Sequence, residues 1–390
     1  MMDFRQRILT AMNHEEPDRV PVMGLIAEPG TSNQILGKPP ADIVSLLTNP
    51  ELRNQIKDIV NSSWHEVLYA NFADALEAAI KLGFDANWTI YTLMQVVEDP
   101  EFRLGLAWHD IHGRVWEQRA DERGNIVMNY VRGLCTTEEE WYAWVESKKP
   151  LFDEFIGNVA DHHRRLADNY RDRILPIAYS DTGVFESTWQ SMGFVNFIKY
   201  VYQKPDFVKK VIDFKTDLYM RYLDAIVKSG AEVVMGGDDL GQKTGPLMRP
   251  DLIEELFGDS YRRISELVHK QDKKLIWHSC GNIYALLDKF VDWGFDGLIT
   301  IEPTAGMDLG KVREQVGHRL VLVGNLDVSY LLVRGTREEV EDAVKKAVKD
   351  AAQGGGYILS PSHSHTSVDA TRLAWMIEAA HKYGKYPITL

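Results

Sequence analysis

The stretch Lys274-Leu-Ile-Trp-His-Ser-Cys-Gly281 is the one around which the chain is organised. It starts as a short apolar run, carries His278 and Cys280 at its carboxyl end, and breaks at Gly281. Residues i and i+2 of a strand point to the same side, so we expect the imidazole and the thiol to converge. The stretch therefore predicts a buried strand that ends in two side chains able to bind a metal.

Strand-like and helical segments alternate around this stretch, through the C-terminal two-thirds of the chain. The strand-like segments are 175–181, 231–239, 274–281, 297–302, 319–325 and 357–361, and an earlier one spans 19–26. This alternation is typical of a parallel sheet covered by helices. Polar residues follow the strand ends, and a barrel gathers all of those ends on one face. We predict an α/β fold, a (β/α)8 TIM barrel, as a single domain over residues 1–390.

The segment of about 84–135 has a different pattern. Aromatic and β-branched residues dominate it, and turn sequences at 110–113 and 121–124 separate strand-like runs. We expect an antiparallel hairpin or meander inserted between elements of the barrel. A structural flap is the favoured role, and a lid or a partner-docking edge is the alternative.

Composition and charge restrict the classes of protein. The chain is 45% hydrophobic and 26% charged, which is ordinary for a soluble enzyme. It contains no run of eighteen apolar residues and its first residues lack the apolar core of a signal peptide, so we expect a cytoplasmic protein without membrane contact. The net charge of -13 argues against a general nucleic-acid binder. Only Cys135 and Cys280 are present, which excludes a disulfide framework.

Two later strand ends add metal-binding groups to those at the end of 274–281. Glu302 lies 24 residues beyond His278, about one α/β unit, and His363 lies 61 residues beyond Glu302, about two units. Zinc at catalytic sites prefers nitrogen and sulfur ligands, sometimes with one carboxylate. We therefore predict that His278, Cys280, Glu302 and His363 bind one zinc ion. Glu302 could instead form a buried ion pair, and His365 competes with His363 as the last ligand.

Other polar and aromatic residues near the strand ends are candidates for chemistry or substrate contact. Asp238 and Asp239 are candidate catalytic acids or partners of a histidine, although a capped turn would explain them equally well. The predicted substrate-binding residues are Tyr179, Asp181, Trp189, Asn325 and His365. The aromatic ones could stack on an aryl group, but core packing is the simpler explanation of each.

At these residues the chain resembles the uroporphyrinogen decarboxylase superfamily, and within it the zinc- and corrinoid-dependent methyltransferases. The resemblance covers nearly the whole chain and is carried by the segments 7–21, 237–241, 278–281 and 361–363. It implies a (β/α)8 barrel. The order His-x-Cys, Glu and a late ligand is also similar to the zinc site of cobalamin-independent methionine synthase. His363 stands where that enzyme has a cysteine.

The decarboxylase itself is recognised by an arginine-rich stretch near the first strand that grips substrate carboxylates. Here the corresponding residues 22–30 contain no arginine, so a polycarboxylate substrate would have no cationic clamp there. Porphyrinogen decarboxylation is accordingly the least favoured activity.

The resemblance implies methyl transfer. The favoured version is an O-demethylase component, in which the methyl group of a methyl ether, such as a methoxylated aromatic, passes to the cobalt of a corrinoid protein. Methylation of a thiol by a methylcorrinoid protein is the alternative. No Asp-x-His-x-x-Gly cobalamin-binding sequence is present, so the corrinoid is expected on a separate partner protein. A homodimer is compatible with the sequence.

Overall fold

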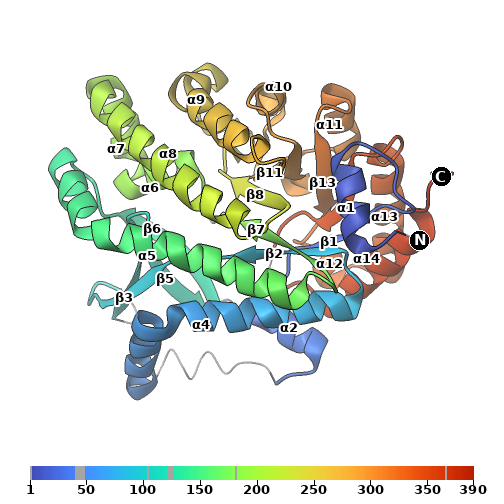
Figure 1. Cartoon of the computed structure of the whole chain (residues 1–390), viewed down its shortest axis with the longest axis horizontal. Coiled ribbons are helices and arrows are strands. Elements are labelled where there is room, and N and C mark those ends of the chain that lie inside the picture. The colour runs from blue at the N-terminus through green and yellow to red at the C-terminus, as the bar shows by residue number, and fades with distance from the viewer. Residues whose placement is uncertain (1, 40–48, 103–104, 121–125, 181, 365–366) are drawn as a thin grey trace.

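An eight-stranded parallel sheet forms the centre of the computed structural model, which describes residues 2–390 apart from 40–48, 103–104, 121–125, 181 and 365–366. A parallel bridge between Val22 and Leu359 joins its first strand to its last, and the Leu359 N–H donates to the Pro21 carbonyl at 2.9 Å. The sheet therefore closes into a barrel (Figure 1), which confirms the predicted fold class. In spatial order the strands are β1 (Met23–Gly24), β2 (Ala86–Ile90), β7 (Leu175–Tyr179), β8 (Val233–Gly237), β11 (Lys274–Ser279), β12 (Gly297–Thr300), β13 (Val321–Leu326) and β14 (Tyr357–Pro361).

Helices surround the barrel and begin where the sequence supplies caps. Asp3 and Gln6 form a capping box at the first helix, and Thr336 and Glu339 form another. The helical region between β7 and β8 is divided into three helices, because Gly193 has a φ of 82° and Lys204 precedes Pro205. The helices are α1 (Phe4–Met12), α2 (Pro29–Leu36), α4 (Pro50–Leu82), α5 (Glu138–Tyr170), α6 (Val184–Met192), α7 (Phe194–Gln203), α8 (Pro205–Lys228), α9 (Pro250–His269), η1 (Tyr284–Leu286), α10 (Leu287–Asp292), η2 (Pro303–Ala305), α11 (Leu309–Val316), α12 (Leu331–Arg334), α13 (Arg337–Ala351) and α14 (Ala370–Tyr383).

The barrel interior is a packed core rather than a channel. Alternate residues of the strands, such as Met235, Ile276 and Ile299, pack together inside it and are fully buried. The buried residues Ile8 and Met12 of α1 belong to the same cluster. Since side chains fill the barrel interior in this way, a reactive site is expected at the carboxyl ends of the strands.

The antiparallel part of the chain is smaller than the predicted insertion of about 84–135. Its four strands pair in the order β3 (Met94–Glu98), β4 (Leu106–Asp110), β5 (Arg114–Ala120) and β6 (Ile126–Gly133). Residues 86–90 instead form β2 of the barrel, parallel to β1 and β7. The turn expected at 121–124 lies outside the described residues. A two-stranded ribbon, β9 (Gly241–Gln242) and β10 (Gly245–Pro246), follows β8.

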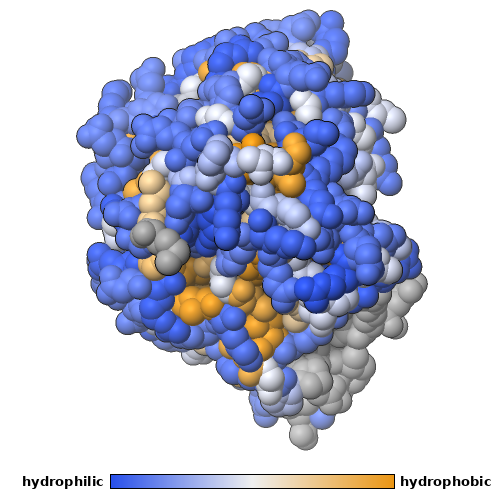
Figure 2. All heavy atoms as spheres, turned by 90° about the vertical axis from the view of Figure 1, so that its right-hand side faces the viewer, coloured by the Kyte–Doolittle hydropathy of each residue, from blue (hydrophilic) through white to orange (hydrophobic). Residues whose placement is uncertain are grey.

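The face of the molecule in Figure 2 is mostly hydrophilic, with hydrophobic side chains gathered in its lower half. Among the described residues, no helix combines the length and the apolar character needed to cross a membrane.

Candidate metal centre

The end of β11 brings an imidazole and a thiol together. Leu275 and Trp277 point outward to the helices, whereas Ile276 points into the barrel, so the alternation directs His278 to the inner side. The His278 side chain is 5% exposed, and its Nε2 atom lies 3.4 Å from Cys280 Sγ. A tetrahedral zinc ion with ordinary bond lengths would hold nitrogen and sulfur about 3.5 Å apart. The strand end therefore already has the spacing of two zinc ligands.

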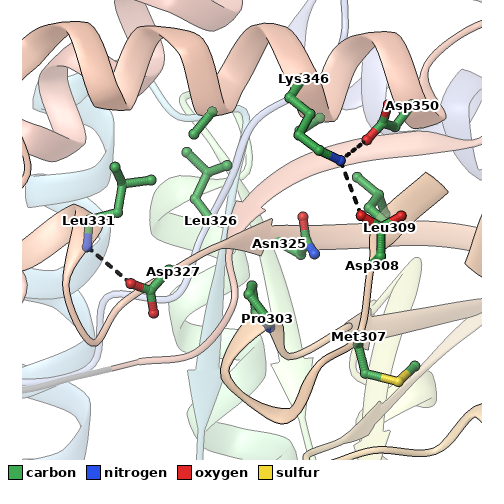
Figure 3. A pocket seen from close by; sticks show the side chains of 12 residues that line it. Pro303, Met307, Asp308, Leu309, Asn325, Leu326, Asp327, Leu331, Lys346 and Asp350 are labelled. Carbon is green, nitrogen blue, oxygen red and sulfur yellow. Dashed lines mark hydrogen bonds and ion pairs between the residues drawn. The ribbon is translucent and has the colours of Figure 1, made fainter. Parts of the chain in front are cut away.

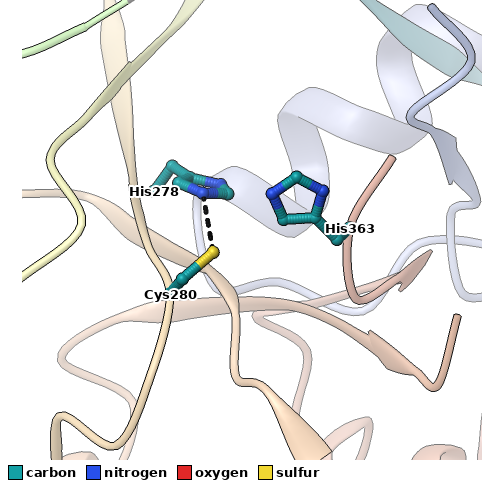
Figure 4. A group of neighbouring side chains, drawn as sticks. All are labelled: His278, Cys280 and His363. Carbon is teal, nitrogen blue, oxygen red and sulfur yellow. Dashed lines mark hydrogen bonds between the residues drawn. The ribbon is translucent and has the colours of Figure 1, made fainter. Parts of the chain in front are cut away.

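His363 completes a cluster of three donors. It follows β14, and its ring centroid lies 5.4 Å from that of His278 at an interplanar angle of 76° (Figure 4). One ligand atom from each of His278, Cys280 and His363 lies within 4.8 Å of the other two. Two imidazoles and one thiol are a donor set that zinc accepts. The residues present fit a zinc ion.

Hydrogen bonds orient both imidazoles. Thr300 Oγ1 lies 3.0 Å from His278 Nδ1, and His363 Nδ1 donates to the Ser364 carbonyl at 2.6 Å. Each ring thus uses Nδ1 away from the cluster and leaves Nε2 for it. Metal-binding histidines are oriented in this way, by a partner on the nitrogen that does not bind the metal.

The backbone after β12 departs from ordinary geometry beside His278. Thr300 has a φ of 104° and Ile301 a φ of 46°, in a region that β-branched residues avoid. This backbone breaks the alternation and allows Thr300 Oγ1 to reach His278. The Asn325 side chain donates to the Ile301 carbonyl at 3.0 Å and so holds the strained segment. Such strain concentrates at functional sites, where the surrounding contacts maintain it.

Glu302, the fourth predicted ligand, lies beside the cluster and outside the group of three. Its Oε2 atom accepts the Gly281 N–H at 2.8 Å, and its Oε1 atom accepts the Thr304 hydroxyl. The carboxylate holds the turn after β11 and is close enough to help raise the pKa of Cys280.

Asp239 is in direct contact with the cluster. Its Oδ1 atom accepts the Cys280 N–H at 2.8 Å and lies 3.4 Å from His278 Nε2. Burial would raise the pKa of Asp239, but hydrogen bonding and the charge of His278 lower it below its ordinary value. Burial, with the charges of Asp239 and Glu302, raises the pKa of Cys280 well above its ordinary value. A divalent cation would neutralise this acidic surrounding and displace the thiol proton, which further supports the fit.

Asp238 has the structural role that the sequence left open. It is fully buried and accepts the backbone N–H groups of Phe185 at 3.0 Å and Glu186 at 2.7 Å, so it caps α6. The Tyr261 hydroxyl donates to it at 2.9 Å, and burial raises the pKa of Asp238 to about 7. A Cβ atom at Gly183 would lie 2.4 Å from an Asp238 oxygen, so this approach requires glycine.

Glu186 was not predicted from the sequence. Its Oε2 atom accepts the Asp239 N–H at 3.2 Å, and burial together with the charges of Asp239 and Asp238 raises the pKa of Glu186 well above its ordinary value. It lies in the first turn of α6, whereas the predicted site residues lie at strand ends. Its place shortly after the end of β7, three residues beyond Gly183, is the signal that could have found it.

The predicted substrate contacts are distributed around the centre. Tyr179 stacks on Trp88 at a centroid distance of 5.3 Å and lies 5.9 Å from the His278 ring. Trp189 packs edge-on against Tyr130 of the antiparallel sheet and against Phe194. Asp181 and His365 lie outside the described residues.

Asn325 also lines a cavity of about 230 Å³ between the ends of β12 and β13 and the helices α11 and α13 (Figure 3). Lys346 bridges Asp308 at 3.2 Å and Asp350 on the wall of this cavity. The three donors of the metal cluster are not among the residues that line it. Asn325 thus contacts the strained segment of Thr300 and Ile301 and also lines this cavity.

Comparisons with known proteins agree with this fold. A family model described as uroporphyrinogen decarboxylase (URO-D) matches residues 146–383. A methylcobamide:CoM methyltransferase, MtaA, of Methanosarcina barkeri is 29% identical over 166 residues, covering 43% of this chain and 46% of that protein. A uroporphyrinogen decarboxylase of Mannheimia succiniciproducens is 27% identical over 198 residues, covering 50% and 53%. The chain thus spans about half the length of these relatives. A solved methyltransferase from Methanosarcina mazei has the same fold, with a TM-score of 0.66 and 18% identity over 98% of this chain and 99% of that one.

Proposed function

The chain belongs to the uroporphyrinogen decarboxylase family, and we propose that it is a methyltransferase of that family that works with a corrinoid protein. The cluster of His278, Cys280 and His363 at the barrel mouth carries this proposal. Both the similarity to a methylcobamide:CoM methyltransferase and the fold of a solved methyltransferase support it.

We propose that His278, Cys280 and His363 hold one zinc ion, with Glu302 as the predicted fourth ligand. Bound there, zinc would supply Lewis acidity towards an oxygen or sulfur atom of the substrate. Thr300 and the Ser364 carbonyl orient the two imidazoles. Of the two roles offered by the sequence, the lowered pKa of Asp239 favours that of an ionised partner of His278 over that of an acid.

The favoured reaction is the removal of a methyl group from a methyl ether. The bond between the ether oxygen and the methyl carbon breaks, a bond between that carbon and the reduced cobalt of the corrinoid forms, and the departing phenolate or alkoxide takes a proton from solvent. A second histidine in place of a thiolate leaves the zinc more electrophilic, which suits ether activation. Tyr179, stacked on Trp88 beside His278, offers an aromatic wall for an aryl group.

Methylation of a thiol by a methylcorrinoid protein is the second candidate. The 29% identity to a methylcobamide:CoM methyltransferase favours it. Uroporphyrinogen decarboxylation is less favoured, because residues 22–30 contain no arginine to bind substrate carboxylates.

The corrinoid would arrive on a separate protein that docks over the carboxyl ends of the barrel strands. In the decisive experiment, zinc-loaded protein is mixed with reduced corrinoid protein and a panel of methoxylated aromatics while the cobalt absorption is followed. Conversion of the cobalt(I) spectrum to that of methylcobalt with an ether is the expected result. Reaction only between a thiol and the methylcorrinoid would establish the second candidate, and reaction in neither assay would contradict both.

A further inference from the structure

The antiparallel sheet supplies a rigidly held arginine that points towards the barrel mouth. Arg114, the first residue of β5, is 4% exposed. Its Nε atom donates to Asp110, which also accepts the backbone N–H of Arg114 at 3.0 Å and the indole N–H of Trp116 at 2.9 Å. A buried arginine held by a carboxylate in this way has a fixed side-chain position.

A chain of hydrogen bonds runs from this arginine to the metal centre. Arg114 donates from its Nη1 atom to Gln190 Oε1 at 3.0 Å, and Gln190 Nε2 donates to Glu186 Oε1 at 3.1 Å. The other oxygen of Glu186 accepts the Asp239 N–H at 3.2 Å, and Asp239 Oδ1 accepts the Cys280 N–H at 2.8 Å. Arginine can only donate, and the amide oxygen of Gln190 accepts from it while the amide NH2 group donates to Glu186, so a glutamine satisfies both neighbours at this position.

The antiparallel sheet lies in close contact with the carboxyl end of α6. The Gln190 carbonyl accepts the Tyr130 hydroxyl at 2.7 Å, and the Ser191 carbonyl accepts the Cys135 N–H at 2.8 Å. A Cβ atom at Gly133 would lie 2.1 Å from the Ser191 carbonyl oxygen, so the sheet backbone rests directly on the helix. The Gln190 side chain is 6% exposed, which removes competition from water and strengthens its hydrogen bonds.

We propose that Arg114 and Gln190 are positioning residues of the metal centre. Through Glu186 they fix the Asp239 segment, which in turn fixes the backbone of Cys280. The antiparallel sheet is then a constituent of the site, not a lid that opens over it. This inference relies on the proposed metal site, and its test separates the two.

The test uses two substitutions at one position, with a matched control. Gln190→Leu removes both side-chain hydrogen bonds, and Gln190→Glu keeps the contact with Arg114 but places a carboxylate against Glu186. Arg132→Gln is the control, because Arg132 lies on the same sheet in an ion pair with Asp99 and is 43% exposed. Zinc affinity is measured by competition with a chelator at pH 8, and the unfolding temperature of each metal-free protein is recorded beside it.

We expect both Gln190 variants to bind zinc about tenfold more weakly, as is typical when the partners that orient metal ligands are lost. The control should bind like the wild type. If Gln190 only attached the sheet to α6, Gln190→Glu should bind zinc like the wild type, since it retains the contact with Arg114. Wild-type affinity in Gln190→Glu would therefore overturn the proposal.

A second measurement needs no metal. Amide hydrogen exchange in the metal-free protein reports on the backbone N–H groups of Asp239 and Cys280, which end the chain of hydrogen bonds. We expect faster exchange in both Gln190 variants and no change in the control, and unchanged exchange in the variants contradicts the positioning role. A wild-type protein that binds no zinc would contradict the proposed function, and the exchange data would still decide this inference.

Discussion

His278 Nε2 and Cys280 Sγ lie 3.4 Å apart at the end of β11. The two side chains are separated by one residue, so the alternation of a strand directs them to the same side. Their spacing is close to the distance of about 3.5 Å expected between two ligands of a tetrahedral zinc ion. The backbone of one strand therefore places the two atoms at the spacing that the proposed zinc site requires.

The Thr300 hydroxyl should control how tightly the metal is held. Thr300→Val removes the contact with His278 Nδ1 and keeps the shape of the side chain. We expect zinc affinity to fall about 10- to 100-fold, because loss of such an orienting partner frees the imidazole ring. Thr300→Ser retains the hydroxyl and should restore most of the affinity. Equal affinity in the valine and serine variants would show that the hydroxyl does not orient His278.

Substitution of Asp238 should mainly lower the stability of the fold, whereas substitution of Asp239 should mainly lower the affinity for zinc. Asp238→Ala leaves the N–H groups of Phe185 and Glu186 and the Tyr261 hydroxyl without their buried partner. Each buried group left unpaired costs about 1–3 kcal/mol, so we expect the free energy of unfolding in urea to fall by about 3 kcal/mol or more. Asp239→Ala should lower zinc affinity with a smaller effect on stability. A stable Asp238→Ala protein would refute the capping role.

His162 should make the protein sensitive to acid. Burial, aided by the charges of His65 and His163, lowers the pKa of His162 to about 3, whereas the ordinary value is 6.5. Below pH 6.5, His162 thus binds a proton in the unfolded chain but stays neutral in the folded one. The free energy of unfolding therefore falls as the pH drops from 6.5 towards 3.

Phenylalanine takes up no proton, so His162→Phe should not lose stability in this way, and its ring should keep the packing against Tyr91, whose ring centroid lies 5.3 Å from that of His162. When the pH is lowered from 7.5 to 4.5, the free energy of unfolding should fall by about 2 kcal/mol less in His162→Phe than in the wild type. Urea unfolding at the two pH values measures the difference. Parallel pH profiles of the two proteins would show that His162 titrates normally in the folded state.

Tyr179 should affect the substrate more than the metal. Its ring lies 5.9 Å from that of His278 and stacks on Trp88. With a methoxylated aromatic substrate, we expect Tyr179→Leu to raise KM about tenfold, since aromatic pairs contribute about 0.5–1.5 kcal/mol beyond area burial. Tyr179→Phe should behave like the wild type, and the zinc content of both variants should be unchanged. A normal KM in the leucine variant would place the aryl group elsewhere.

Much of the barrel could be predicted from the sequence, because seven of its strands are short apolar runs separated by helical segments. The eighth, β2, was missed because 86–90 is followed directly by strands of similar composition, and only pairing in space assigns it to the barrel. The His-x-Cys pair could be found because residues i and i+2 of a strand point to the same side.

The surroundings of the site could not be predicted in the same way. Thr300 reaches His278 only because its φ is 104°, which no pattern of residue types encodes. Glu186 and Arg114 come from a helix and from the antiparallel sheet, and tertiary packing alone brings them near the strand ends. Glu302 lies at the expected strand end, but its oxygens bind the Gly281 N–H and the Thr304 hydroxyl.

Zinc K-edge X-ray absorption spectroscopy of the zinc-loaded protein shows which atoms bind the metal. If His278, Cys280 and His363 hold it, we expect one zinc ion per chain with one sulfur at about 2.3 Å and two imidazole nitrogens at about 2.0–2.1 Å, and loss of the sulfur signal in Cys280→Ser. The matched variant Cys135→Ser, at a cysteine that is not part of the cluster, should keep that signal. Zinc bound without sulfur, or a sulfur signal that persists in Cys280→Ser, would contradict the proposed zinc site.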